Sequence, residues 1–212
     1  MKKLVLISAL ASLTAMFASA TTINYDTTGS TLLCNGVAEC TQNTTTSVTI
    51  GGITLTYNTG SGSGVDTPSI INLGNIVSTG SGTNVSLTNL LLTINVNSTP
   101  PGSGGTLPDG SVTGSISTNN SGSLLMFSPN NTITGFGALP GVTISGGGLT
   151  LIYQVLQTTL GLQAPTVGNP IGQTSIQGAV TQIISESPEP STLFLTGIGL
   201  IAFAFIRRPV KR

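Results

Sequence analysis

The fold class is decided by one stretch of the chain, Ser47-Val48-Thr49-Ile50-Gly51-Gly52-Ile53-Thr54-Leu55-Thr56-Tyr57. Apolar and polar side chains alternate on both sides of its Gly-Gly pair. Such alternation is typical of half-buried strands, and a Gly-Gly pair between two of them is typical of a tight hairpin turn. The stretch therefore predicts a β-hairpin.

The same pattern continues outward from this hairpin. In Thr88–Val96 the even-numbered positions from 90 onward are apolar, whereas Thr93 and Asn95 lie on the opposite face. Glycine-rich segments at 59–64 and 79–82 are interpreted as loops, and Asp109-Gly110 as a turn. Further candidate strands are Val112–Ile116, Leu124–Phe127, Val142–Ile144 and Leu149–Leu156. Strands at intervals of about ten residues predict an all-β fold, an antiparallel β-sandwich or jelly-roll-like body with Gly/Ser/Thr-rich loops.

Two segments leave alternatives open. Thr174–Ile184 has apolar residues at helical spacing, but it also lies where a last strand should run. The pattern of residues 48–57 recurs at 142–153 with a longer glycine spacer. This echo is interpreted either as two similar hairpins of a two-sheet fold or as a coincidence of β-rich composition, since a repeat fold needs more copies at a fixed period.

Charged residues are distributed very unevenly along the chain. The chain has no His, and residues 21–186, which we call the mature body, have no Lys and no Arg. The six basic residues are Lys2, Lys3, Arg207, Arg208, Lys211 and Arg212. The carboxylates of the mature body are Asp26, Glu39, Asp66, Asp109 and Glu186. The mature body is therefore weakly acidic and almost uncharged.

This composition argues against most kinds of functional site. Nucleic-acid binding needs cationic side chains against phosphate. Catalytic triads and Ser-Lys dyads need His or Lys, zinc sites draw on His and several Cys, and phosphoryl transfer needs cations. The composition leaves one catalytic alternative open, a paired-carboxylate hydrolase built on Asp66 and Asp109, but both residues are isolated in the sequence. We expect no enzyme, no catalytic residue, no cofactor, no metal and no nucleic-acid partner.

The two cysteines, Cys34 and Cys40, bracket an Asn35-Gly36 turn signal. In an exported chain such a pair can oxidise, and closing a loop of this size contributes roughly 2 kcal/mol on the chain-entropy model. A redox pair would favour Cys-x-x-Cys spacing. We predict a structural disulfide that closes a small hairpin-like loop.

Residues 1–20 have the three parts of a signal peptide. Lys2 and Lys3 are followed by the uncharged apolar run 4–17, and Ala18 and Ala20 supply the small side chains that a signal peptidase requires. An uncleaved anchor is the alternative, but the run is short for a membrane span. We expect export through the Sec machinery and cleavage after Ala20.

Residues 187–212, which we call the sorting tail, also have three parts. Pro188-Glu189-Pro190 is incompatible with a continuing helix, and a helix can begin at Ser191 or Thr192. The uncharged run up to Ile206 would then form a helix of about 24 Å, near the lower limit for a membrane span. The positive-inside rule keeps the basic end, Arg207, Arg208, Lys211 and Arg212, in the cytoplasm. An ordinary tail anchor after a proline-rich stalk is the alternative.

This tail resembles the PEP-CTERM sorting signal, in which a Pro-Glu-Pro motif precedes one hydrophobic helix and an arginine-rich end. The resemblance implies processing by an exosortase in a Gram-negative-type bacterium that makes an exopolysaccharide or biofilm matrix. It implies a chain that is anchored transiently in the inner membrane through the helix and then passes to the cell surface or extracellular matrix. The resemblance covers the tail alone.

The sequence thus predicts three parts: a signal peptide (1–20), a β-rich extracytoplasmic body (21–186) and the sorting tail (187–212). We expect a structural protein of the surface or the exopolysaccharide matrix, with exopolysaccharide or other copies of the chain as partners. A carbohydrate-binding module is the first alternative, and it would require exposed Tyr25, Tyr57 or Tyr153 in one groove. The second alternative, a glycoside hydrolase, would require two facing carboxylates.

Overall fold

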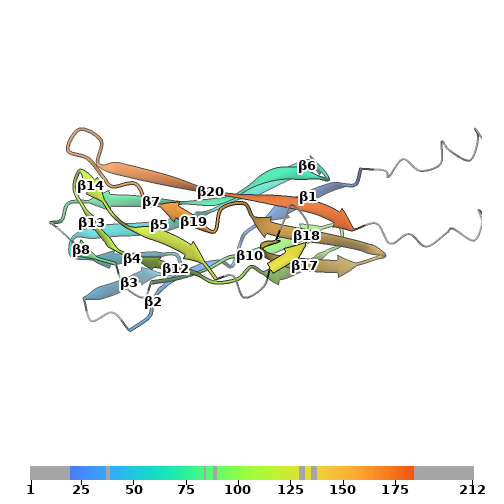
Figure 1. Ribbon diagram of the computed structural model, residues 1–212, viewed down its shortest axis with the longest axis horizontal. Coiled ribbons are helices and arrows are strands. Elements are labelled where there is room, and N and C mark those ends of the chain that lie inside the picture. The colour runs from blue at the N-terminus through green and yellow to red at the C-terminus, as the bar shows by residue number, and fades with distance from the viewer. Residues whose placement is uncertain are drawn as a thin grey trace, which may run out of the picture.

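The computed structural model describes residues 20–36, 39–83, 85–87, 90–128, 132–134 and 138–183. These residues form an elongated body in which the strands run roughly along the long axis (Figure 1). The strands are β1 (Thr22–Asp26), β2 (Thr31–Cys34), β3 (Cys40–Thr44), β4 (Ser47–Ile50), β5 (Ile53–Thr59), β6 (Ser61–Asp66), β7 (Ser69–Gly80), β8 (Val85–Ser86), β9 (Leu90–Thr93), β10 (Asn95–Thr99), β11 (Ser103–Thr106), β12 (Gly110–Thr113), β13 (Ser115–Ser117), β14 (Asn120–Ser121), β15 (Leu124–Phe127), β16 (Thr132–Thr134), β17 (Ala138–Gly146), β18 (Leu149–Val155), β19 (Thr159–Gly161) and β20 (Ile171–Ile183).

The strands are arranged in four sheets. The eight-stranded sheet has the order β16-β17-β18-β20-β7-β5-β4-β3, and the five-stranded sheet has the order β19-β15-β12-β9-β2. A four-stranded sheet, β11-β10-β1-β6, and a three-stranded sheet, β14-β13-β8, complete the described body. Neighbouring strands pair antiparallel in each sheet. The predicted all-β antiparallel class is therefore confirmed, whereas the jelly-roll assignment stays a prediction.

The predicted hairpin at 47–57 is present as β4 and β5, with Ile50 opposite Ile53. Gly51 and Gly52 connect the strands at φ 54° and 83°, a backbone region that residues with a Cβ rarely adopt. The echo at 142–153 is also a hairpin, formed by β17 and β18. The two hairpins lie in the same sheet, on either side of the central pair of β20 and β7. Both segments are thus hairpins, but in one sheet of four rather than in a two-sheet fold.

Several predicted element boundaries are wrong. The segment 59–64, predicted as a loop, contains the end of β5 and most of β6. The predicted strand Thr88–Val96 is divided between β9 and β10, which belong to different sheets, although its apolar face is buried as expected. The predicted strand Val112–Ile116 is divided at Gly114, which has φ 101°. The ambiguous segment from Thr174 onward is a strand, because it lies within β20.

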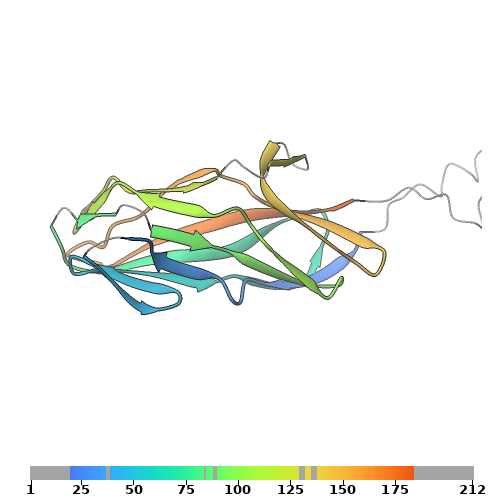
Figure 2. The same cartoon turned by 90° about the horizontal axis from the view of Figure 1, so that it is seen from below.

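The core is one cluster of buried apolar side chains that all four sheets share. Ile23 comes from the four-stranded sheet, Leu32 from the five-stranded sheet, Val48 from the eight-stranded sheet and Ile116 from the three-stranded sheet. The turned view shows strands stacked on both sides of this interior (Figure 2). Burial of apolar surface between the sheets, at about 25 cal/mol per Å², is the main force that holds them together.

The two ends of the described chain lie at the same end of the body (Figure 1). Thr67 connects them, since its backbone N–H donates to the carbonyl oxygen of Thr21 over 3.1 Å and its hydroxyl donates to Gln182 Oε1 over 3.3 Å. The opposite end of the body, which we call the distal end, carries β3, β13, β14 and the start of β20 (Figure 1).

The targeting segments predicted from the sequence fall almost entirely outside the described residues. Of the signal peptide, only Ala20 is described, and it is exposed just before β1. The Pro-Glu-Pro motif, the apolar run and the basic end are outside the described ranges. Across the ranges that are described, no helix is both long and apolar enough to cross a membrane.

Candidate functional site

The two carboxylates considered for hydrolysis lie in different parts of the fold. Asp66 ends β6 in the four-stranded sheet and accepts a hydrogen bond from Thr22 Oγ1 over 2.8 Å. Asp109 precedes β12 in the five-stranded sheet and accepts one from Thr93 Oγ1 over 2.8 Å. Each carboxylate is exposed and stabilises a local loop or strand end. The described residues therefore do not bring Asp66 and Asp109 together as a pair.

Asp26 is likewise held by local hydrogen bonds. Its Oδ1 accepts from Asn97 Nδ2 and from the backbone N–H of Thr28, both over 2.9 Å. These bonds, with that from Asn97 as the largest influence, lower the pKa of Asp26 below its usual value. The remaining described carboxylate, Glu39, is exposed next to Cys40. Among the described residues, no three side chains of His, Cys, Asp or Glu gather into a metal-binding group.

The three tyrosines are buried rather than exposed. Tyr25 is 6% exposed, Tyr57 2% and Tyr153 0%. Burial raises the pKa of each phenol, and each hydroxyl is hydrogen-bonded inside the protein. Phe127 is also buried, and Phe136 lies outside the described residues. The groove of exposed tyrosines that a carbohydrate-binding module would require is thus not formed.

Cys34 and Cys40 form the predicted disulfide, with Cα atoms 5.9 Å apart. The prediction that it closes a hairpin is wrong. Cys34 ends β2, which pairs with β9, and Cys40 begins β3, which pairs with β4. The disulfide therefore connects the edge strands of the five-stranded and eight-stranded sheets, a role that sequence spacing alone does not reveal.

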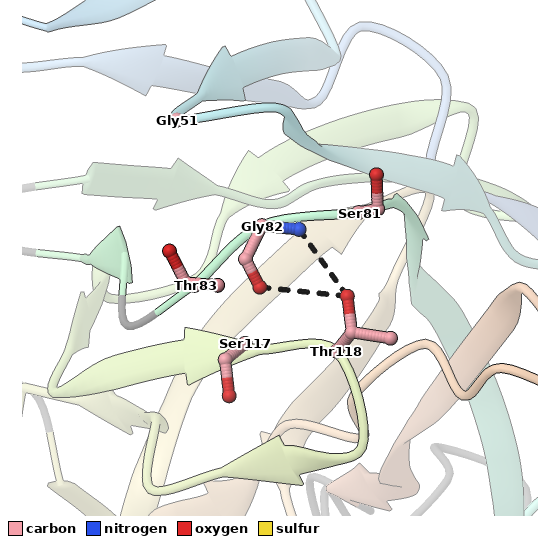
Figure 3. A pocket seen from close by; sticks show the side chains of 6 residues that line it. All are labelled: Gly51, Ser81, Gly82, Thr83, Ser117 and Thr118. Carbon is pink, nitrogen blue, oxygen red and sulfur yellow. Dashed lines mark hydrogen bonds between the residues drawn. The ribbon is translucent and has the colours of Figure 1, made fainter.

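A polar pocket of about 540 Å³ opens at the distal end of the body (Figure 3). The backbone N–H of Gly82 donates to Thr118 Oγ1 over 3.2 Å, and the backbone N–H of Thr118 donates to the Gly82 carbonyl oxygen over 3.0 Å. These bonds fix the loop after β7 against the turn between β13 and β14. The pocket is lined by Gly51, Ser81, Gly82, Thr83, Ser117 and Thr118.

The chemistry of this pocket is that of uncharged hydrogen bonding. Hydroxyls and backbone groups both donate and accept, so they fit a neutral, hydroxylated ligand. The residues that line it include no carboxylate, amine or imidazole group. No sequence motif indicates this pocket, because its residues come from Ser/Thr/Gly segments that are far apart in the chain. The pairing of β5 with β7 places Gly51 beside the loop that follows β7, and the pairing of β13 with β8 and β14 adds Ser117 and Thr118.

A second cavity of about 620 Å³ lies on the five-stranded sheet. The exposed side chain of Met126 and the partly exposed side chain of Leu91 give it an apolar floor, and Asp109 lies among its polar groups. No other carboxylate lines it. The lining residues are Leu91, Asp109, Ser111, Met126, Phe127, Ser128, Thr158 and Thr159.

Comparison with known proteins identifies one matching segment. The PEP-CTERM protein-sorting motif matches residues 188–208, which include Pro188, Glu189, Pro190, Arg207 and Arg208. No curated protein and no solved structure matches the chain. The motif implies an exported protein that an exosortase sorts. The chain thus carries a PEP-CTERM protein-sorting motif at residues 188–208, joined to an all-β body that is not matched to any family.

Proposed function

We propose that the chain is a non-enzymatic structural protein of the bacterial cell surface or exopolysaccharide matrix. In this proposal a signal peptidase removes residues 1–20, the sorting tail holds the chain in the inner membrane, and an exosortase then releases or transfers the body. The match of the PEP-CTERM motif to residues 188–208 is the observation that carries the proposal.

The composition and the described structure support a role outside the cytoplasm. The body contains a disulfide, which persists in oxidising compartments. Its described termini leave from one end of the body, so the distal end can project away from the point of attachment (Figure 1). We infer further that the stacked sheets form a sandwich of the jelly-roll type, in which the shared core supports long polar loops.

A structural role, rather than catalysis, is supported by what the described side chains do. The carboxylates Asp26, Asp66 and Asp109 each accept hydrogen bonds from neighbouring Thr or Asn groups. The body has no Lys, Arg or His to stabilise a developing negative charge. Both cavities are lined without a pair of carboxylates.

The proposal is tested by changing the motif in the full-length chain inside the producing bacterium. The variant Pro188→Ala/Glu189→Ala/Pro190→Ala removes the processing motif, and Ser185→Ala/Glu186→Ala/Ser187→Ala, just upstream of the matched residues, is the control. We expect the triple variant to accumulate with its tail in the inner membrane, while the wild type and the control leave it. If the triple variant reaches the surface like the wild type, the exosortase route is wrong.

A further inference from the structure

The outer face of the eight-stranded sheet carries an extended array of uncharged polar side chains. The inward positions of β5 and β7, such as Leu55, Tyr57 and Ile76, are buried in the core. Because successive side chains of a strand point to opposite faces, the residues between them face outward. We call this array the hydroxyl face. Its polar members are Thr41, Asn43, Thr49, Thr54, Thr56, Asn58, Asn75, Thr79, Gln173 and Ser175, each partly or fully exposed. Two apolar side chains share the face, the partly buried Val77 and the exposed Ile171, which is opposite Thr79.

Four threonines of the hydroxyl face lie in one row across four adjacent strands. Thr41 of β3 is opposite Thr49 of β4, which is opposite Thr54 of β5. Thr54 is in turn opposite Thr79 of β7. Adjacent strands are about 4.8 Å apart, so the row is about 14 Å long and presents hydroxyl groups at regular intervals.

Hydrogen bonds between its own side chains order the face. Thr49 Oγ1 and Thr54 Oγ1 lie 2.7 Å apart, and Asn43 Nδ2 donates to Thr49 Oγ1 over 2.7 Å. Within the described part of the chain, no hydrogen bond is formed by the hydroxyls at the two ends of the row, Thr41 and Thr79. The row therefore combines a fixed centre with hydroxyl groups that are directed to solvent and free to bind a ligand.

The chemistry of this face selects among the partners it can bind. It contains no charged residue. Its lack of aromatic residues distinguishes it both from typical protein–protein interfaces, which are enriched in aromatic residues, Met and Arg, and from the aromatic groove of a carbohydrate-binding module. An anionic polymer would find no counter-charge, since the whole mature body lacks cationic side chains. A neutral polymer with many hydroxyl groups can donate to and accept from the row at several points.

We propose that the hydroxyl face binds a neutral polysaccharide, with the row of Thr41, Thr49, Thr54 and Thr79 as its centre. This inference rests on the proposed matrix function, since it names the partner of the exported body. Each hydrogen bond is weak in water, so affinity comes from many contacts along one polymer. The row lies towards the distal end, which is opposite to the end where the described chain begins and ends (Figure 1).

The test measures binding of the exported protein, recovered from the producing cells, to three insoluble or bead-coupled polymers. These polymers are cellulose, the neutral polysaccharide fraction of the cells' own matrix, and polygalacturonate as an anionic control. The variant Thr49→Val/Thr54→Val/Thr79→Val removes three hydroxyls but keeps β-branched side chains of similar shape. The matched control, Thr31→Val/Thr113→Val/Thr159→Val, makes the same change on the five-stranded sheet. The variant Thr49→Ser/Thr54→Ser/Thr79→Ser restores the hydroxyls, and thermal unfolding checks that all variants fold.

We expect the wild type to bind a neutral polymer and not polygalacturonate. The face variant should bind about tenfold more weakly, whereas the control and the serine variant retain binding. Equal binding by the face and control variants, loss of binding by the serine variant, preference for the anionic polymer, or no binding of wild type to either neutral polymer would overturn the inference. Non-binding protein that is nevertheless exported and cleaved leaves the proposed function intact. Protein that never leaves the inner membrane contradicts the proposed function itself.

Discussion

At the scale of single residues, the hydroxyl of Thr27 is a junction between three parts of the fold. It accepts a hydrogen bond from the backbone N–H of Gly60 over 2.8 Å and one from the Tyr57 hydroxyl over 3.0 Å. The single proton of the Tyr57 hydroxyl is shared between Thr27 Oγ1 and the carbonyl oxygen of Leu73. Thr27 and Tyr57 are both buried, so water cannot replace a lost partner without cost.

Removing the phenolic hydroxyl of Tyr57 should therefore reduce stability. We expect Tyr57→Phe to lower the free energy of unfolding by about 1–2 kcal/mol, because the Leu73 carbonyl oxygen loses a buried donor. Tyr153→Phe is the matched comparison, since among the described residues its hydroxyl has one hydrogen-bond partner, Ser98 Oγ at 2.8 Å. Urea denaturation measures both. A smaller loss for Tyr57→Phe than for Tyr153→Phe would contradict the role of the Thr27 junction.

At the scale of elements, the side chain of Gln42 covers the open edge of β2. Gln42 Oε1 accepts from the backbone N–H of Cys34 over 3.0 Å, and its Nε2 donates to the carbonyl oxygen of Leu32 over 2.8 Å. The backbone N–H of Leu32 donates to the carbonyl oxygen of Thr45 over 2.8 Å. An edge strand with unpaired backbone groups is a site for aggregation, and charged residues often protect it. Here an amide and a loop do so in a body without lysine.

The variant Gln42→Ala should expose this edge. We expect a loss of about 1–2 kcal/mol in the free energy of unfolding, because two backbone groups of β2 lose their partners. We also expect faster aggregation, followed by light scattering. Gln173→Ala is the control, since Gln173 is exposed on β20 and its side chain makes no hydrogen bond within the described part of the chain. The same change in both variants would contradict the account.

Gly74 of β7 lies at a register shift between β7 and β20. It has φ 124°, and a Cβ built on it would collide with the carbonyl oxygen of Asn58. We expect Gly74→Ala to destabilise the protein by more than about 2 kcal/mol, because strain and collision add. Gly148→Ala separates backbone strain from collision, since Gly148 has φ 79° but an added Cβ there would meet open space. Thermal unfolding should show a clearly larger loss for Gly74→Ala.

Local patterns predicted individual hairpins well, but they did not predict which sheet a strand joins. The 47–57 hairpin depends on neighbours in sequence, so its alternation and its glycine pair sufficed. The segment 59–64 was predicted as a loop because glycines usually mark turns. In the structure Gly60 and Gly62 lie in or next to strands. Glycine is needed at both positions, because a Cβ on Gly60 would meet the carbonyl oxygen of Asn72 and one on Gly62 would meet the ring of Tyr25. Such close approaches depend on tertiary packing, which sequence spacing does not encode.

The candidate binding surfaces were less predictable than the hairpins. Alternation placed Thr49 and Thr54 on the outer face of one hairpin from sequence alone. The row that they form with Thr41 and Thr79 depends on the register between strands that are far apart in the chain. The sorting motif could be found from the sequence because its residues are contiguous, and its recognition does not depend on the fold of the body.

At the scale of the whole molecule, the absence of cationic side chains simplifies the response to pH. In the pH range above the titration of carboxyl groups and below that of tyrosines, the only group of the mature body that titrates is its α-amino group. We expect the urea midpoint to change little from about pH 6 to pH 9. The raised pKa of Tyr57 and Tyr153 means that the folded state holds protons more tightly than the unfolded state. Stability should therefore fall as the pH rises above about 10.

The acid side of the same profile has the opposite sign. The pKa of Asp26 is lowered in the folded state, so its contribution to stability is present above about pH 4 and is lost as the pH falls through the lowered value. Urea denaturation at closely spaced pH values measures both limbs, with tyrosinate absorbance reporting the alkaline one. A marked transition near pH 6.5, where histidine titrates, would contradict this account.

The central claim is that the chain is exported, sorted and processed at both ends. Intact-mass spectrometry of the protein from separate fractions of the producing cells tests it most directly. The account predicts a chain outside the inner membrane that begins at Thr21 and ends close to Pro188-Glu189-Pro190, with any extra mass reporting an attached group. A chain that still carries residues 203–212 and stays in the inner membrane would contradict the claim. The protein would then be tail-anchored and unprocessed.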